Sequence, residues 1–167
     1  MSAVENVMIG LNSTAEYSFL EGMLRLPGAR RKEKAAREQA IEYLARVDMA
    51  RFQDTPAGAL PYGLQRKLEI ARAIATRPKL LLLDEPAAGM NNEETAALIQ
   101  FIRSLHKASE TNMAIVIIEH HLEVVMNLCG DITVFNLGEV LARGTPEQIQ
   151  NDPRVIRAYI GQRRRAP

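Results

Sequence analysis

The sequence predicts an α/β protein in which a helical first part precedes a small parallel sheet. Across residues 1–76, apolar and charged residues recur at helical spacing, and no strand-like alternating run occurs. Beyond residue 76, two short continuous apolar runs, at 80–83 and 113–118, enclose a segment of helical periodicity. The order strand, helix, strand is typical of a parallel crossover unit, and continuous apolar runs are typical of strands buried on both faces.

The helical part divides at recognisable signals. Ser2 and Glu5 have the spacing of a capping box, which predicts a helix at the start of the chain. The Pro27-Gly28 pair interrupts the pattern, and further helices are expected over about residues 31–47 and 64–76. A basic cluster at the start of the second helix could bind nucleic acid or lipid headgroups, but the glutamates mixed into it favour a solvated helix face.

The second part continues as alternating helices and strands after the first apolar run. The expected elements, in order, are a helix capped by Asn91 or Asn92, the strand at 113–118, a helix near 121–128, a hairpin of strands at 131–135 and 139–143, and a short helix that begins at Thr145-Pro146. The chain ends in a basic tail that contains Arg163, Arg164 and Arg165.

Length and composition fit one ordinary soluble domain. The 167 residues are 47% apolar and 25% charged, and 21 Lys and Arg against 20 Asp and Glu give a formal net charge of +1. This balance argues against a globally basic nucleic-acid-binding protein, and the longest apolar run is far shorter than the ~20 residues of a membrane helix. The single cysteine, Cys129, makes an internal disulfide impossible, and no secretory signal is visible, so a reducing cytosolic setting is expected.

The strongest chemical signal is the pair Asp84-Glu85 at the end of the first predicted strand. Ligands of open α/β sheets bind beyond the carboxyl ends of the strands, which is where these carboxylates are placed. Asp84 is suited to hold Mg²⁺ through water, and Glu85 to accept a proton from, or orient, an attacking water beside a nucleotide phosphate. The alternative is that one of them merely caps the next helix.

Two further features are placed for phosphate chemistry. The Gly-containing segment 58–63 directly precedes a predicted helix, which aims free N–H groups and a positive dipole end at an anion. His120 follows the second buried strand and is therefore expected on the same sheet edge as Asp84 and Glu85, where it could hydrogen-bond a terminal phosphate or the attacking water. The alternative for His120 is a helix-start residue without catalytic importance.

The order of these motifs resembles that of ABC-type ATPases. Leu-Pro-Tyr-Gly-Leu-Gln at 60–65, the strand that ends in Asp84-Glu85-Pro86, the segment 87–91 and Ile118-Glu119-His120 resemble the signature motif, the Walker B strand, the D-loop and the switch-histidine loop. Within that family, the segments 85–91 and 143–161 are similar to the ATP-binding subunit of branched-chain amino acid importers. The resemblance implies a partial P-loop NTPase core, with a parallel-sheet remnant, preceded by an α-helical subdomain.

The resemblance also implies roles for individual residues, with ATP and Mg²⁺ as cofactors. Asp84 would help to hold Mg²⁺, Glu85 would be the catalytic carboxylate, and His120 would sense the γ-phosphate. The residues that would contact a nucleotide held by the opposite subunit of a head-to-tail dimer are Leu60, Pro61, Tyr62, Gly63, Leu64 and Gln65, and Asn91 lies in the D-loop.

Three residues depart from the family pattern. Pro61 offers neither a hydroxyl nor a backbone N–H, and Leu64 replaces a common Gln, so the N–H groups of Tyr62, Gly63 and the residues just after them are left as donors. Asn91 replaces a common Asp and keeps a hydrogen-bonding side chain. Contact with the nucleotide in the opposite subunit is therefore expected to be weaker.

The phosphate loop G-x-x-x-x-G-K-[ST] is missing from the sequence, and in this family it would lie upstream of Met1. The chain alone is therefore expected to be unable to bind ATP normally, and its partial sheet to leave apolar edges that favour dimerisation or aggregation. Three parts are expected: a helical subdomain with the signature motif at 1–76, the later half of the nucleotide-binding core at 77–150, and a C-terminal helix with the basic tail at 151–167.

The resemblance implies partners and a location for the intact subunit. The partners would be a second ATPase subunit, membrane permease subunits and, indirectly, a periplasmic binding protein, but not nucleic acid. The subunit would be cytoplasmic and peripheral on the inner face of the cell membrane. The alternatives are a non-catalytic module that docks on transporter subunits, and a nucleotide enzyme outside transport, such as an ABC-type ATPase that works on DNA ends or an Asp-Glu-box helicase.

Overall fold

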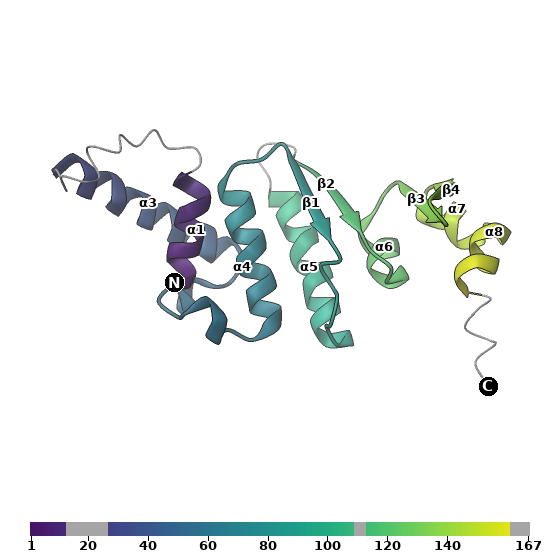
Figure 1. Ribbon diagram of the computed structural model, residues 1–167, viewed down its shortest axis with the longest axis horizontal. Helices are drawn as coiled ribbons and strands as arrows, with labels where there is room; N and C mark the ends of the chain where they lie inside the picture. Colours follow the sequence, from purple (N-terminus) through teal and green to yellow (C-terminus); the bar gives the residue numbers. More distant parts are fainter. Residues whose placement is uncertain (13–26, 109–112, 161–167) are drawn as a thin grey trace.

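The structure, a computed structural model, describes residues 1–12, 27–108 and 113–160. The basic tail lies outside these residues, as does the part of the helical region between 12 and 27. Figure 1 shows the described elements in a row, with the N-terminal helices at one end, a pair of strands with its helix in the middle, and a small C-terminal unit at the other end.

The N-terminal part is helical, as predicted. It contains α1 (Ala3–Asn12), α3 (Pro27–Arg46) and α4 (Tyr62–Ala75), with the short 3₁₀ turns η1 (Ala50–Phe52) and η2 (Ala57–Ala59) before α4. The predicted capping box is present, because the Glu5 N–H donates to Ser2 Oγ at 3.3 Å and the Ser2 N–H donates to Glu5 Oε2 at 2.8 Å. Helix α3 begins earlier than predicted, at Pro27, because proline is tolerated in the first turn of a helix.

One hydrophobic core joins these helices to the sheet that follows. Helix α1 packs against both α3 and α4. The core continues through the covered face of the sheet to the helices beyond, and some of its members from each part are Val4, Leu44, Leu68, Leu81, Ile102 and Val124. The hydrophobic core is therefore continuous across the predicted boundary at residue 76.

The middle of the chain forms the predicted parallel crossover. Strand β1 (Leu80–Asp84) pairs in parallel with β2 (Ala114–Ile118), and α5 (Asn92–Ala108) connects them. Of the two candidate caps, Asn91 is the one used, since its Oδ1 accepts a hydrogen bond from the Glu94 N–H at 2.9 Å. Glu94 Oε2 accepts in return from the Asn91 N–H at 3.0 Å, which completes a capping box.

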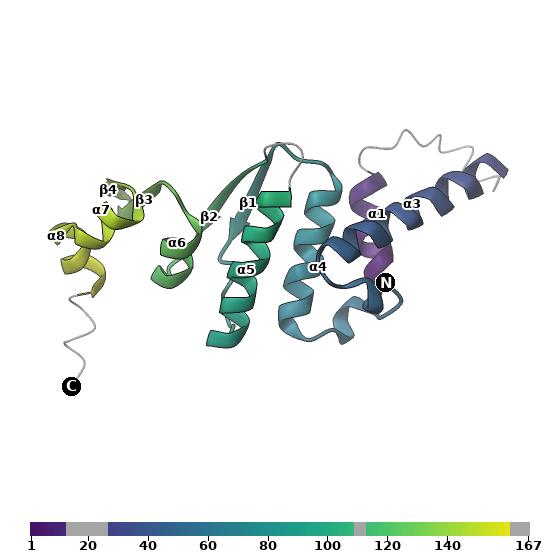
Figure 2. The same ribbon diagram turned by 180° about the vertical axis from the view of Figure 1, so that it is seen from behind.

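The prediction that both strands are buried on both faces is wrong for the described residues. Helix α5 covers one face of the pair, as Figures 1 and 2 show from opposite sides. Leu81 on the covered face is 5% exposed, whereas four apolar residues of the opposite face, here called the open sheet face, are at least 48% exposed: Leu80, Leu82, Val116 and Ile118. A continuous apolar run indicates that both faces of a strand can be buried, but the described residues bury only one face of this sheet.

The C-terminal elements form a second, smaller unit. After α6 (Leu122–Leu128), strands β3 (Ile132–Asn136) and β4 (Glu139–Gly144) pair as the predicted antiparallel hairpin, and α7 (Pro146–Asn151), α8 (Pro153–Val155) and the π-helical turn η3 (Ile156–Ile160) follow. Thr145 and Gln148 form a capping box at the start of α7. A separate apolar cluster holds this unit together: Ile132, Ala142, Ile149 and Val155.

Candidate active site

The carboxyl ends of β1 and β2 meet at one edge of the sheet. The two strands run in parallel with Asp84 opposite Ile118, so residues that follow these positions leave the sheet together. Pairing extends one residue further, because the Glu85 N–H donates to the Ile118 carbonyl oxygen at 2.8 Å. After each strand the backbone turns away from the sheet. The residues that the sequence predicted to take part in catalysis lie at these two turns.

Glu85 and His120 lie side by side at this edge. Glu85 Oε1 is 3.4 Å from His120 Nδ1, and the two side chains are 53% and 59% exposed. The prediction that a histidine after β2 shares an edge with the carboxylates after β1 is therefore confirmed. Their exposure leaves both groups accessible to a ligand above the sheet edge, while the chemical roles assigned to them stay predictions.

The backbone at Glu85 carries the turn that aims its side chain. Its φ of 44° lies in the left-handed region, which residues other than glycine rarely adopt. The turn closes by a hydrogen bond from the Ala88 N–H to the Glu85 carbonyl oxygen at 3.1 Å. Because Asn91 caps the following helix, the alternative that Asp84 or Glu85 serves as that cap is wrong.

Asp84 fits a divalent hard cation. It is exposed at the end of β1, and among the described residues no hydrogen bond or ion pair engages its carboxylate. Mg²⁺ binds carboxylate oxygens and keeps several of its waters, so one open carboxylate at this edge is a suitable anchor. Asp84 could therefore anchor such an ion.

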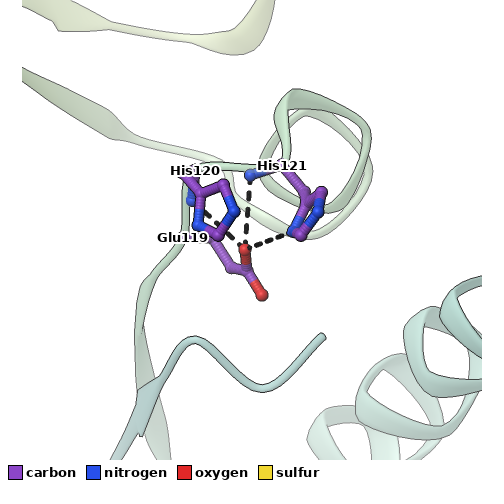
Figure 3. A group of neighbouring side chains, drawn as sticks. All are labelled: Glu119, His120 and His121. Atoms are coloured by element: carbon purple, nitrogen blue, oxygen red, sulfur yellow. Dashed lines mark hydrogen bonds and ion pairs between the residues drawn. The ribbon is translucent and has the colours of Figure 1, made fainter. Parts of the chain in front are cut away.

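Glu119 is a member of the site for which the sequence suggested no role. Its side chain is fully buried. Its Oε1 accepts from the Ala87 N–H at 2.8 Å. Its Oε2 accepts from the His120 N–H at 3.1 Å, the His121 N–H at 3.3 Å and His121 Nδ1 at 3.1 Å, and Figure 3 shows these three bonds. Burial acts to raise the pKa of Glu119, but the hydrogen bonds from Ala87 and His121 outweigh it, and the pKa lies below its ordinary value. A charged carboxylate thus joins the two turns.

The turn at the start of α4 presents backbone N–H groups, as the sequence predicted, but fewer of them. Pro61 stands at the N-cap position and makes no side-chain capping bond. The N–H groups of Leu64 and Gln65 both donate to the Pro61 carbonyl oxygen, at 2.9 and 3.0 Å. The first N–H groups of a helix have no partner within it, so Tyr62 and Gly63 are the donors left for an anion.

The side chains of this segment point to different surroundings. Leu60 is 4% exposed and belongs to the main core, so its side chain does not face a ligand. Gln65 folds back, and its Nε2 donates to the Leu60 carbonyl oxygen at 2.7 Å. Tyr62 is exposed and accepts a hydrogen bond at its hydroxyl from Arg66 at 2.7 Å.

The start of α4 lies beside the start of α5. A Cβ built on Gly63 would come 3.9 Å from Glu94 Oε1, and one built on Gly89, whose φ is 76°, would come 3.8 Å from Tyr62 Cε1. Asn91, the predicted D-loop residue, uses its side-chain oxygen for the cap of α5. Two of the predicted motifs are therefore neighbours within one chain.

Comparison with protein families gives two matches. Residues 3–88 match the ABC transporter family, and residues 139–164 match the family of the branched-chain amino acid ATP-binding cassette transporter. The first match contains α1, α4 and the turn with Glu85, and the second contains β4 and the C-terminal helices. The two matches lie on either side of His120.

Curated relatives cover almost the whole of this chain. BraF of Pseudomonas aeruginosa, a high-affinity branched-chain amino acid transport ATP-binding protein, is 45% identical over 97% of this chain. LivG of Escherichia coli K12, which carries the same description, is 41% identical over 97% of this chain. The chain spans 63% of the length of each of these relatives.

A solved structure has the same arrangement of elements. MJ1267, described as an ATP-binding cassette of an ABC transporter, superposes with a TM-score of 0.76 at 28% identity, over 96% of this chain and 63% of its own.

No helix within the described ranges is long and apolar enough to cross a membrane.

Proposed function

Because the chain belongs to the ABC transporter family, we propose that it is part of the ATP-hydrolysing subunit of an importer for branched-chain amino acids. The similarity to BraF and LivG supports the substrate class, and the C-terminal family match supports the importer type. One observation carries the chemistry: Glu85 and His120 lie 3.4 Å apart at the sheet edge that also carries Asp84.

The proposed reaction is attack of water on the terminal phosphate of ATP. Glu85 accepts the proton of the attacking water or orients it, and its exposure gives a water molecule access to the carboxylate. His120 directs one ring nitrogen to Glu85, which leaves the other for a hydrogen bond to the γ-phosphate. Asp84 would hold Mg²⁺, which when bound would supply positive charge to neutralise the phosphates.

The start of α4 is proposed to contact a nucleotide held by a second subunit. The N–H groups of Tyr62 and Gly63 and the positive end of the helix dipole attract phosphate oxygens. Without a hydroxyl or an N–H at Pro61, this contact has fewer donors. The dimer would act on membrane permease subunits from the cytoplasmic side of the membrane, with a periplasmic binding protein as an indirect partner.

The chain alone is proposed to be inactive, because its 167 residues contain no G-x-x-x-x-G-K-[ST] segment to hold the β- and γ-phosphates. This observation also favours a second candidate for the isolated chain, a module that docks on transporter subunits without hydrolysis. Titration calorimetry of the purified chain with Mg-ATP tests whether the chain alone binds the nucleotide. We expect no binding at micromolar concentrations, and a micromolar affinity would contradict the proposal that the chain alone is inactive for lack of a phosphate loop.

The reaction itself is tested in a longer protein, in which the BraF segment that precedes the matched region is joined before this chain. We expect this extended protein to hydrolyse ATP. Glu85→Gln should lower kcat on the order of 10²-fold or more and retain ATP, since it removes the proton acceptor and keeps the shape.

The matched control is Glu93→Gln, which removes an exposed carboxylate from the first turn of α5. This control should hydrolyse ATP at the unmodified rate. Unchanged turnover in Glu85→Gln would remove Glu85 from the role of base.

A further inference from the structure

We propose that Glu119 is a positioning residue, which clamps the turn after β1 to the turn after β2 and thereby holds Glu85 against His120. This inference rests on the proposed function, since it names what sets the distance between the two proposed catalytic groups. The evidence is the set of hydrogen bonds that converge on the Glu119 carboxylate from both turns.

The carboxylate takes over where the sheet ends. The last backbone bond between the strands runs from the Glu85 N–H to the Ile118 carbonyl oxygen. In a parallel ladder the next donor on this strand is the N–H two residues on, which is that of Ala87. Ala87 donates instead to Glu119 Oε1 at 2.8 Å. The side chain therefore replaces the ladder at the point where the backbones diverge.

Strand alternation explains why Glu119 reaches inward. Ile118 lies on the open sheet face and is 62% exposed. The next residue points to the opposite face, so the Glu119 side chain enters the covered side, where Ala87 is 1% exposed. His120 then returns to the open side, beside Glu85. The buried Glu119 carboxylate thus lies between the two turns, and Glu85 and His120 lie on the other side of the sheet edge.

The clamp also supports a turn that costs free energy by itself. A residue other than glycine with positive φ persists only where its surroundings hold it, and Glu85 has such a φ. Glu119 holds this turn at Ala87, directly past Pro86, and holds the other turn at His120 and His121. The lowered pKa of Glu119 is consistent with this, because the clamp needs the charged form at neutral pH.

A metal ion is a poorer explanation of the same residues. One ligand atom from each of Glu119, His120 and His121 lies within 4.8 Å of the others, which is a spacing that a cation could use. Both carboxylate oxygens, however, already accept N–H donors of the protein. A cation would have to displace these hydrogen bonds. The cluster is therefore better explained as a hydrogen-bonded link between the two turns than as a metal site.

The first test uses this chain by itself and measures amide hydrogen exchange at Ala87 by NMR. In the unmodified chain we expect this amide to be protected although it lies in a turn. Glu119→Gln keeps the shape but brings an NH₂ group to face N–H donors on one side of the clamp. Exchange at Ala87 should become at least about tenfold faster, while the ladder amide of Leu83 keeps its protection.

The second test uses the extended protein and separates positioning from folding. Glu119→Gln should lower kcat on the order of tenfold to hundredfold with little change in the KM for ATP, since misplaced reacting groups slow the chemical step. Glu123→Gln removes an exposed carboxylate in the first turn of α6 and should leave both constants unchanged.

Each outcome bears on one claim. An unprotected Ala87 amide in the unmodified chain overturns the clamp whether or not the protein hydrolyses ATP. This measurement does not depend on the folding of any variant. Faster exchange at Ala87 in Glu119→Gln with unchanged kcat overturns the positioning role. If instead the extended protein hydrolyses no ATP, the proposed function fails while the clamp stands on the exchange data. Unchanged turnover in Glu85→Gln removes only the role of Glu85 as base.

Discussion

Pro61 is the residue that most changes what the start of α4 can do. It occupies the N-cap position with no side-chain capping bond, and its own carbonyl oxygen engages the N–H groups of Leu64 and Gln65. A serine at this position has a hydroxyl that can accept from the first turn of the helix. The same hydroxyl can contact a phosphate, so cap and ligand contact need to be separated by experiment.

We predict that Pro61→Ser is more stable than Pro61→Ala by about 1 kcal/mol in free energy of unfolding, because only serine caps α4. The comparison with alanine matters, because both variants lose the rigidity of proline in the unfolded chain. Urea denaturation of the two variants measures the difference. Equal midpoints at equal m values would show that no cap forms.

In the extended protein, the same two variants test the ligand contact. We expect Pro61→Ser to strengthen ATP-driven dimerisation, measured by sedimentation, and Pro61→Ala to leave it weak, since alanine restores an N–H but no hydroxyl. If the alanine variant dimerises as strongly as the serine variant, the missing N–H of Pro61 explains the weak contact and the missing hydroxyl does not.

At the residue level, the sequence predicted the groups that lie in motifs but not the group that connects them. Asp84 ends a strand, and Glu85 and His120 follow strands. Because parallel strands end at one edge, the sequence predicted that these residues are neighbours. Glu119 stood next to His120 without a role, because its hydrogen bond to Ala87 depends on how both turns leave the sheet. A usable signal was present: strand alternation turns Glu119 inward, where a carboxylate must find N–H donors.

Among the elements, the contact between α1 and α4 depends on a glycine. A Cβ on Gly10 would collide with the carbonyl oxygen of Arg72 on α4. Backbone atoms cannot move aside as a flexible side chain can, so the helices would have to separate. Helix α1 in turn packs against α3, and any shift would be passed to the rest of the helical part.

We predict that Gly10→Ala lowers the free energy of unfolding. Overpacking costs ~1–3 kcal/mol, which exceeds the ~1 kcal/mol that alanine gains over glycine inside a helix. Gly28→Ala in α3 is the matched control, because nothing lies within 4 Å of its Cβ position. This control should be neutral or slightly more stable in urea denaturation. A Gly10→Ala chain as stable as the control would show that α1 and α4 can move apart without cost.

The order and type of the elements were predictable, but the cover of the sheet was not. Apolar periodicity and caps predicted the helices, the crossover and the hairpin, because these depend on residues close in sequence. Leu82 reads as a buried strand residue for the same local reason, yet it is 68% exposed. Whether a strand face is covered depends on distant segments, which no local pattern reports.

On the scale of the whole molecule, the described residues form two apolar cores and leave some apolar surface exposed, of which the open sheet face is the part in the parallel sheet. The main core runs from α1 to α6, and the smaller one holds the β3–β4 hairpin against α7 and α8. The open sheet face lies outside both, on the side of the sheet that also carries Asp84. Contiguous exposed apolar surface drives association, so this face should govern how the isolated chain behaves in concentrated solution.

We predict that Leu82→Lys reduces self-association of the isolated chain, measured by sedimentation over a range of concentrations. A charge in the middle of the open sheet face disfavours contact between two such faces. Because Leu82 is 68% exposed, the free energy of unfolding should change by no more than about 0.5 kcal/mol. Leu137→Lys is the matched control. Leu137 is more exposed, at 96%, but lies between β3 and β4, which belong to the other sheet. An equal effect of both substitutions would show that net charge, and not the open sheet face, controls association.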